Sequence, residues 1–166
     1  MYKRQVNDIS GLSFDSEMIE VVRKYEAPIV IMHMKGNPQN MQLSPSYDNI
    51  IEEISSFFHE RIRLLINKGI SKESIIIDPG IGFGKTIKNN FELINRLSDF
   101  DVFDLPIMIG TSNKSFIGSS LDLPVNQRFE GTCATTAVGI MNGARIVRVH
   151  DVKRIKRVVI LSLIHI

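Results

Sequence analysis

Short runs rich in β-branched residues alternate with segments of helical periodicity along most of this chain, and this alternation restricts the possible folds more than any other feature. We predict five strands, at residues 6–9, 27–34, 74–77, 106–109 and 144–149. The predicted helices lie at residues 17–25, 47–67, 90–97 and 131–141, and a last one begins near Val152. Strands that alternate with helices form right-handed β-α-β units around a parallel sheet. The sequence therefore predicts an α/β fold.

Polar residues stand at or just after the end of every one of these predicted strands. They are Asn7 and Asp8, His33, Asp78, the segment 110–115, and Arg148 with His150 and Asp151. A (β/α)8 barrel builds its functional site from residues at the carboxyl ends of its strands, whereas a doubly wound sheet gathers them at one switch point. Because all the predicted strands carry such residues, we favour a barrel. A complete barrel needs about 250 residues. With 166 residues, the chain is expected to be a partial (β/α)8 TIM barrel with five of eight βα units.

The composition is that of an ordinary globular domain. Hydrophobic residues make up 43% and charged residues 23% of the chain, and the net charge is +2. That charge is too small to indicate binding to nucleic acid or to a membrane surface. The one cysteine, Cys133, excludes an internal disulfide bond and fits the reducing cytosol. We therefore expect a single incomplete domain over residues 1–166 in the cytoplasm, with neither a nucleic-acid nor a membrane partner.

The segment 75–86 gives the strongest single indication of a ligand site. Its three isoleucines form a predicted buried strand, Asp78 ends that strand, and a loop with three alternating glycines follows Pro79. The loop lacks the first glycine of a phosphate P-loop, and its G-x-G-x-G pattern differs from the G-x-G-x-x-G of dinucleotide sites. The carboxylate is therefore the better candidate for binding. The alternative is an exposed aspartate in a turn.

Six sequence blocks occur in the order and spacing typical of one enzyme family. They lie at residues 6–11, 31–38, 78–85, 110–118, 130–132 and 146–152. Together they resemble dihydropteroate synthases, which are transferases of folate biosynthesis. The resemblance implies condensation of hydroxymethyl-dihydropterin pyrophosphate with p-aminobenzoate to give 7,8-dihydropteroate and pyrophosphate, with Mg²⁺ as cofactor. It also implies that the intact parent protein is a homodimer.

The same resemblance implies which part of the family's barrel is present. The chain begins at the fourth family strand, so the loop that meets Mg²⁺ and the aspartate of the third strand belong to a missing upstream part. No metal ligand is expected within these residues. Residues 1–5 and 161–166 do not match the family and are interpreted as non-native ends. We expect the chain on its own to be an inactive fragment.

Individual residues also receive roles from the resemblance. The expected contacts are Asn7, Met32, Asp78, Phe83, Gly110 and Lys114 for the pterin, Ser115 for p-aminobenzoate, and Arg148 and His150 for pyrophosphate. Asp78, Lys114 and Arg148 are the expected catalytic residues. A carboxylate accepts two parallel N–H bonds from a heterocycle, and a guanidinium grips a phosphate in the same forked way. Ser115 is expected at a helix N-terminus, which favours an anion such as the p-aminobenzoate carboxylate. The family usually has arginine where this chain has Asn113.

Other interpretations of these residues stay open. Asn7 could instead close its strand in an Asx-turn, and Arg148 and His150 could form a solvated strand end. His33 and Cys133 are expected to be packing residues. A pterin-binding methyltransferase domain is a related alternative function, but a methyl donor has no pyrophosphate for Arg148 and His150 to bind. A non-catalytic remnant is the other alternative.

Overall fold

The computed structural model describes residues 5–41, 43 and 45–163 of the chain. The strands are β1 (Val6–Asp8), β2 (Ile29–Met32), β3 (Ile75–Asp78), β4 (Met108–Ile109) and β5 (Ile146–Val147). The α-helices are α1 (Met18–Lys24), α2 (Ile50–Asn67), α3 (Ile87–Asn95), α4 (Ser115–Leu121), α5 (Phe129–Met141) and α6 (Val152–Ser162). Short 3₁₀ segments occupy Lys72–Ser74, Leu97–Phe103 and Val125–Gln127. Of the ends interpreted as non-native, residues 1–4 and 164–166 lie outside the described residues.

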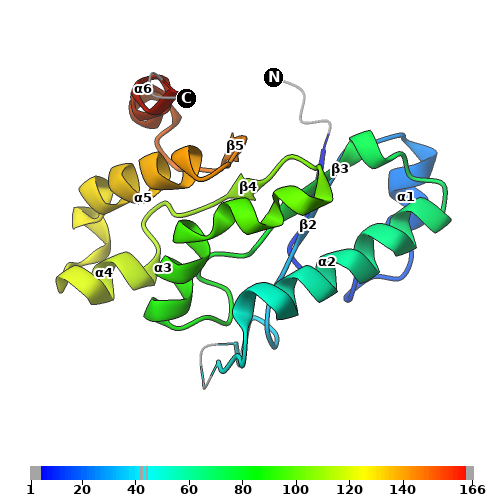
Figure 1. Ribbon diagram of the computed structural model, residues 1–166, viewed down its shortest axis with the longest axis horizontal. Coiled ribbons are helices and arrows are strands. Elements are labelled where there is room, and N and C mark those ends of the chain that lie inside the picture. The colour runs from blue at the N-terminus through cyan, green and yellow to red at the C-terminus, as the bar shows by residue number, and fades with distance from the viewer. Residues whose placement is uncertain (1–4, 42, 44, 164–166) are drawn as a thin grey trace.

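The strands lie side by side in the order in which they occur along the chain (Figure 1). β1, β2 and β3 form one parallel sheet, and β4 and β5 form a second parallel pair. A parallel bridge between Ile77 and Ile107 connects β3 to the segment that leads into β4. Sequential parallel strands with intervening helices are the wall of a barrel. Among the described residues, β1 pairs only with β2 and β5 only with β4, so the wall covers part of a barrel.

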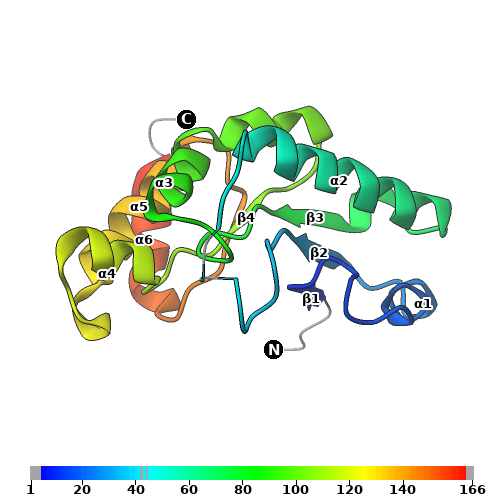
Figure 2. The same cartoon turned by 90° about the horizontal axis from the view of Figure 1, so that it is seen from below.

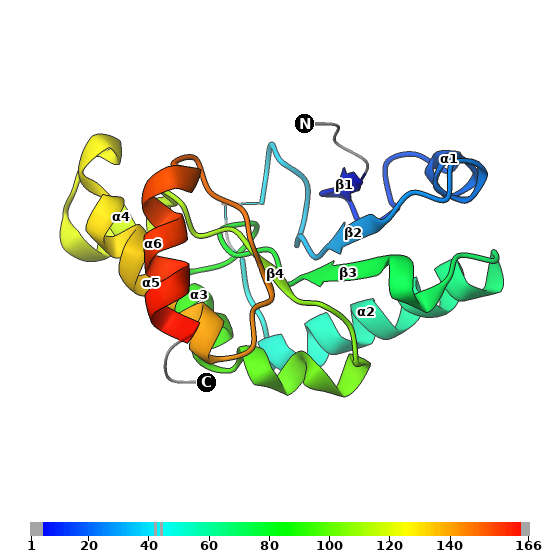
Figure 3. The same cartoon turned by 90° about the horizontal axis from the view of Figure 1, so that it is seen from above.

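Alternate residues of β2 and β3 face opposite sides of the sheet, as the pleat of a strand requires. Ile31 and Ile77 belong to the main core, where they join Phe58 of α2 and Leu93 of α3. Figures 2 and 3 show α2 lying alongside β3 on this outer side. The opposite side carries a second, much smaller cluster, formed by Val30, Ile76 and Met108 with Ile146 packed against it. These residues form one layer of the barrel interior.

Side-chain caps explain where two helices begin. The Asn49 side chain accepts a hydrogen bond from the Glu52 backbone N–H, so α2 begins at Ile50. Thr86 and Asn89 form a capping box, and α3 therefore begins at Ile87, earlier than its apolar pattern predicts. The structure also contains α4, which is absent from the helices predicted by periodicity but begins at Ser115, where the resemblance implies a helix N-terminus. β5 (Ile146–Val147) is shorter than the strand predicted at residues 144–149.

Candidate functional site

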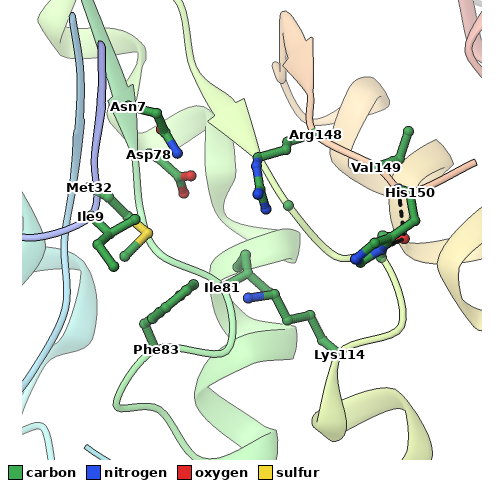
Figure 4. Close-up of a pocket in the computed structure, with 12 residues that line it drawn as sticks. Asn7, Ile9, Met32, Asp78, Ile81, Phe83, Lys114, Arg148, Val149 and His150 are labelled. Carbon is green, nitrogen blue, oxygen red and sulfur yellow. Dashed lines mark hydrogen bonds between the residues drawn. The ribbon is translucent and has the colours of Figure 1, made fainter. Parts of the chain in front are cut away.

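A cavity of about 480 Å³ opens at the carboxyl ends of the strands (Figure 4). Its lining is formed by Asn7, Ile9, Met32, Asp78, Ile81, Phe83, Gly110, Ser112, Lys114, Arg148, Val149 and His150. The structure thus brings together in one cavity every residue expected to contact the pterin and both residues expected to contact pyrophosphate. Ser115, the residue expected to contact p-aminobenzoate, does not line this cavity; it is exposed and is the first residue of α4. The roles themselves stay predictions.

Strand register explains why residues far apart in the sequence meet here. Asn7 pairs with Val30, and Met32 pairs with Asp78. Val30 and Ile76 face the barrel interior, and residues two apart on a strand share a face. Asn7, Met32 and Asp78 therefore project into the interior at the ends of three adjacent strands.

Asp78 is the buried acceptor of the cavity, with only 6% of the residue exposed. Its Oδ1 accepts a hydrogen bond of 2.8 Å from the Gly80 backbone N–H. Burial raises the pKa of the carboxyl to about 6, against the opposing effects of the Gly80 N–H and the charges of Lys85, Lys114 and Arg148. Asp78 is therefore largely ionised at neutral pH and can accept two N–H bonds from a ligand.

Lys114 reaches the cavity across the face of Phe83, with its Nζ 3.9 Å from the ring centroid. Gly82 has a φ of +83°, and a Cβ there would lie 2.9 Å from Lys114 Cδ, so the glycine leaves room for the lysine side chain. Burial lowers the pKa of Lys114, with Asp78 opposing and Arg148 adding to the shift. The arrangement places a cation on the aromatic wall, where it interacts electrostatically with the buried carboxylate.

Arg148 and His150 line the cavity from the segment that follows β5 (Figure 4). The Arg148 backbone N–H donates to the Ile109 carbonyl oxygen at 2.8 Å, which extends the pairing with β4 by one residue. His150 Nδ1 lies 2.8 Å from Ser112 Oγ, and the same hydroxyl accepts from the His150 backbone N–H at 3.3 Å. Both cationic candidates are therefore held by contacts with β4 and the loop that follows it.

Asn113 occupies a left-handed backbone conformation, with φ of +56°, in the loop before α4. Its N–H donates to Thr132 Oγ1 at 3.1 Å, and its carbonyl oxygen accepts from Arg128 Nη1 at 3.1 Å. The loop that carries Lys114 is thus tied to α5. Asparagine is one of the few residues that adopt this conformation readily, which gives Asn113 a structural reason to stand here.

Two polar residues of the site were missed by sequence reasoning. Ser112 holds His150, and its only sequence signal is its place within the block 110–118. Lys85 is 3% exposed and lies beside His33, outside the cavity lining. A lysine in a glycine-rich loop is expected to be solvated, so its burial has no signal in the sequence. His33 itself is buried among Tyr47, Phe57 and Lys85, as expected for a packing residue.

Two kinds of feature are absent from the described ranges. Within them, no group of three or more His, Cys, Asp or Glu side chains is arranged to hold a metal ion. None of the helices in those ranges has the length and apolar character needed to cross a membrane.

Comparison with known proteins gives a consistent result. A family model described as pterin binding enzyme matches residues 1–150. The chain is 41% identical over 148 residues to dihydropteroate synthase of Escherichia coli K12, covering 89% of this chain and 52% of that protein. It is 44% identical over 154 residues to the Synechocystis dihydropteroate synthase, covering 92% and 53%. The crystal structure of Yersinia pestis dihydropteroate synthase with a sulfonamide drug complex superposes with a TM-score of 0.94 at 38% identity, covering 98% of this chain and 59% of that one. The predicted partial barrel is thereby confirmed, and the chain spans about half the length of the curated relatives it matches.

Proposed function

The chain belongs to the pterin binding enzyme family, and we propose that it is part of a dihydropteroate synthase. This enzyme is a transferase that joins hydroxymethyl-dihydropterin pyrophosphate to p-aminobenzoate. The observation that carries the proposal is a buried carboxylate, Asp78, that shares one cavity with the cationic side chains of Lys114 and Arg148. Because the chain spans about half of its relatives, the activity is proposed for the longer protein that contains it, which we call the parent protein.

Pterin recognition is proposed for the deep part of the cavity. The Asp78 carboxylate accepts N–H bonds from the amino group and the adjacent ring nitrogen, and the Asn7 amide supplies a further donor and acceptor. Met32 and Phe83 form the apolar walls, and Gly110 also lines the cavity. Lys114 is placed to donate to the pterin carbonyl. A flat heterocycle with a donor edge and apolar faces suits this combination of groups.

The reaction that we propose is a substitution at the methylene carbon of the pterin. The bond from this carbon to the pyrophosphate oxygen breaks, and the leaving group takes the electron pair. The neutral amine of p-aminobenzoate then forms the new C–N bond, and the resulting ammonium releases one proton to solvent. Arg148 and His150 bind the leaving pyrophosphate, and the exposed N-terminus of α4 at Ser115 is proposed to receive the carboxylate of p-aminobenzoate. The protein contributes positioning and charge stabilisation, without a covalent intermediate.

Mg²⁺, a cytoplasmic location and a homodimeric state are further proposals for the parent protein. The described residues do not supply a metal site, and the reaction steps proposed above use only side chains and backbone groups of this chain. Binding of Mg²⁺ is proposed for the upstream loop that the family resemblance implies. The single cysteine, Cys133, supports a reducing compartment.

The alternative, a pterin-binding methyltransferase domain, predicts a different ligand preference. A methyl donor has no pyrophosphate, and it would leave Arg148 and His150 without a ligand in the cavity. We therefore expect the parent protein to bind hydroxymethyl-dihydropterin pyrophosphate more tightly than the bare hydroxymethyl pterin, and inorganic pyrophosphate to compete with the former. Equal affinities, without competition by pyrophosphate, would favour the methyltransferase.

Replacing Arg148 with alanine should weaken binding of the pyrophosphate ester far more than binding of the bare pterin. The reason is that the guanidinium is assigned to the phosphates, and a charged hydrogen bond contributes about 1.5–3 kcal/mol, or roughly ten- to a hundredfold in affinity. Calorimetric titration of the parent protein with both ligands measures the difference. Arg145→Ala, which removes an exposed arginine at the opposite end of β5, is the matched control. Equal losses for the two ligands would refute the role of Arg148.

A further inference from the structure

Lys85 is a buried cation that the proposed reaction does not use. Its Nζ donates to the Phe83 carbonyl oxygen at 2.9 Å, lies 3.1 Å from His33 Nδ1, and has the His33 carbonyl oxygen at 3.4 Å. These are three acceptor positions around one nitrogen. An ammonium has three N–H donors, whereas a neutral amine has two. The geometry therefore fits a protonated Lys85 with His33 Nδ1 as an acceptor.

The state of His33 agrees with this assignment. Burial, as the largest cause, and the charges of Lys85 and Lys35 together lower the pKa of His33 to about 3. A neutral imidazole carries its proton on one nitrogen only. If Lys85 donates to Nδ1, that proton must reside on Nε2. The contact thus predicts the Nε2–H tautomer for neutral His33.

Lys85 also joins the glycine loop at residues 80–84 to the end of β2. Gly80 has a φ of +72°, and a Cβ at this position would lie 1.9 Å from the His33 carbonyl oxygen. The loop therefore lies directly on the backbone of residue 33. The hydrogen bonds of Lys85 with Phe83 and His33 stabilise this contact between the loop and the backbone of residue 33. Through Phe83, whose ring faces Lys114, the same bonds fix one wall of the cavity.

The charge of Lys85 acts on Asp78 as well. Burial lowers the pKa of Lys85 to about 7, and the Asp78 carboxylate opposes this shift. In return, Lys85 is one of the cations that oppose protonation of Asp78. The geometry places the two groups near each other, since the His33 backbone N–H donates to the Asp78 carbonyl oxygen at 3.0 Å while the His33 ring contacts Lys85. Opposite charges at such neighbouring buried positions stabilise each other's ionised form.

We propose that Lys85 is a positioning residue for pterin recognition: its ammonium anchors the glycine loop to His33 and keeps the Asp78 carboxylate ionised. The inference rests on the proposed function, since Asp78 is taken to bind the pterin. Lys85 itself touches no substrate. It acts through the Phe83 backbone and the charge of Asp78.

The other charged groups around this pair stay in place when Lys85 is replaced. Lys114, from the loop before α4, and Arg148, from the segment after β5, both act on Asp78. His33 faces Lys85 from the end of β2, and Lys35 acts on His33. With Lys85 removed, the pKa of Asp78 should rise, because one of the three cations that lower it is lost and burial is unchanged.

Lys85→Met in the parent protein should produce a loss of pterin affinity that depends on pH. An increase of about one to two units in the pKa of Asp78 gives about a two- to tenfold loss at pH 7. The loss should shrink to less than about twofold at pH 8.5, because Asp78 is ionised there without help from Lys85, whose pKa of about 7 leaves it largely neutral in wild type. Calorimetric titration at several pH values measures the ratio of variant to wild-type Kd, and this ratio cancels ionisation of the ligand. Lys88→Met, which removes an exposed lysine of α3, is the control and should behave as wild type.

Lys85→Gln tests the charge of Lys85 while keeping a donor at this position, and it serves where the methionine variant does not fold. Its amide still donates to Phe83 but carries no charge, so the same pH-dependent loss is expected. A loss independent of pH in both variants would mean a purely structural residue and would overturn the proposal. Unchanged affinity at every pH would overturn it as well.

Two measurements on the ligand-free parent protein distinguish failure of this inference from failure of the proposed function. Carbon NMR of the Asp78 carboxyl should show a higher pKa in Lys85→Met than in wild type. Nitrogen NMR should show His33 as the Nε2–H tautomer in wild type. If wild type binds no pterin while both signatures are present, the proposed function fails and the Lys85–Asp78 pairing stands. An Nδ1–H tautomer of His33, or an Asp78 carboxyl pKa that is unchanged in Lys85→Met, would overturn the inference whether or not a pterin binds.

Discussion

Asp78→Asn in the parent protein should weaken pterin binding by roughly ten- to a hundredfold at pH 7.5, because one charged hydrogen bond contributes about 1.5–3 kcal/mol. The amide presents one acceptor and one donor where the carboxylate presents two acceptors. One pterin N–H therefore loses its partner and meets an N–H group instead. The bond from Gly80 to the side-chain oxygen can persist, so the loop should keep its conformation. Calorimetric titration with hydroxymethyl pterin measures the loss.

The pH dependence makes this prediction more specific. Since the pKa of Asp78 is raised to about 6, wild type holds the carboxylate above that pH and loses it as the pH falls through 6. Wild-type affinity should therefore fall toward that of Asp78→Asn between pH 7 and pH 5, while the variant changes little. Asp122→Asn, on an exposed turn whose left-handed backbone asparagine tolerates, is the matched control. Unchanged pterin binding by Asp78→Asn would refute the assignment of this carboxylate to pterin binding.

The 166-residue chain on its own should neither unfold cooperatively nor form dihydropteroate. In the described part of the chain, β1 and β5 each have one pairing partner, and their outer edges are open. A closed barrel has no such edges. The interior layer formed by Val30, Ile76 and Met108 is also small, because barrel layers draw on strands from all the way round. Exposed edges and an incomplete interior favour aggregation or a molten state.

Differential scanning calorimetry and near-UV circular dichroism test this second prediction, with the parent protein as the comparison. The isolated chain is expected to show a broad or absent thermal transition and weak aromatic signals, whereas the parent protein shows a sharp transition. A sharp transition of the isolated chain, together with measurable product from both substrates, would show that five βα units suffice.

The order of strands and helices could be predicted from the sequence because each element follows its own periodicity. The apolar runs that become β2 and β3 are buried on both faces, so they contain uninterrupted isoleucine and valine. The same pattern predicts Asp78 at the end of a strand. Its position beside Asn7 and Met32 follows from parallel register, which makes strand ends meet at one edge. The specific ligand came from the family resemblance rather than from these patterns.

Other features could not be predicted because they depend on contacts between distant segments. Periodicity did not predict α4, whose preceding loop is held by contacts of Asn113 with Thr132 and Arg128. Lys85 is buried only because the residue-33 backbone passes close to its loop. No sequence pattern around Lys85 indicates this close approach of the residue-33 backbone. The strand predicted at residues 144–149 was also too long, since β5 ends at Val147 and Arg148 and His150 follow it, although both residues line the cavity.

We propose above that this cavity belongs to an enzyme that makes dihydropteroate. The direct measurement supplies the purified parent protein with hydroxymethyl-dihydropterin pyrophosphate, p-aminobenzoate and Mg²⁺, and follows both products by chromatography. We predict that 7,8-dihydropteroate and pyrophosphate form in equal amounts and that Asp78→Asn abolishes most of this turnover. A folded parent protein that binds the pterin but releases no pyrophosphate and forms no dihydropteroate would contradict the account.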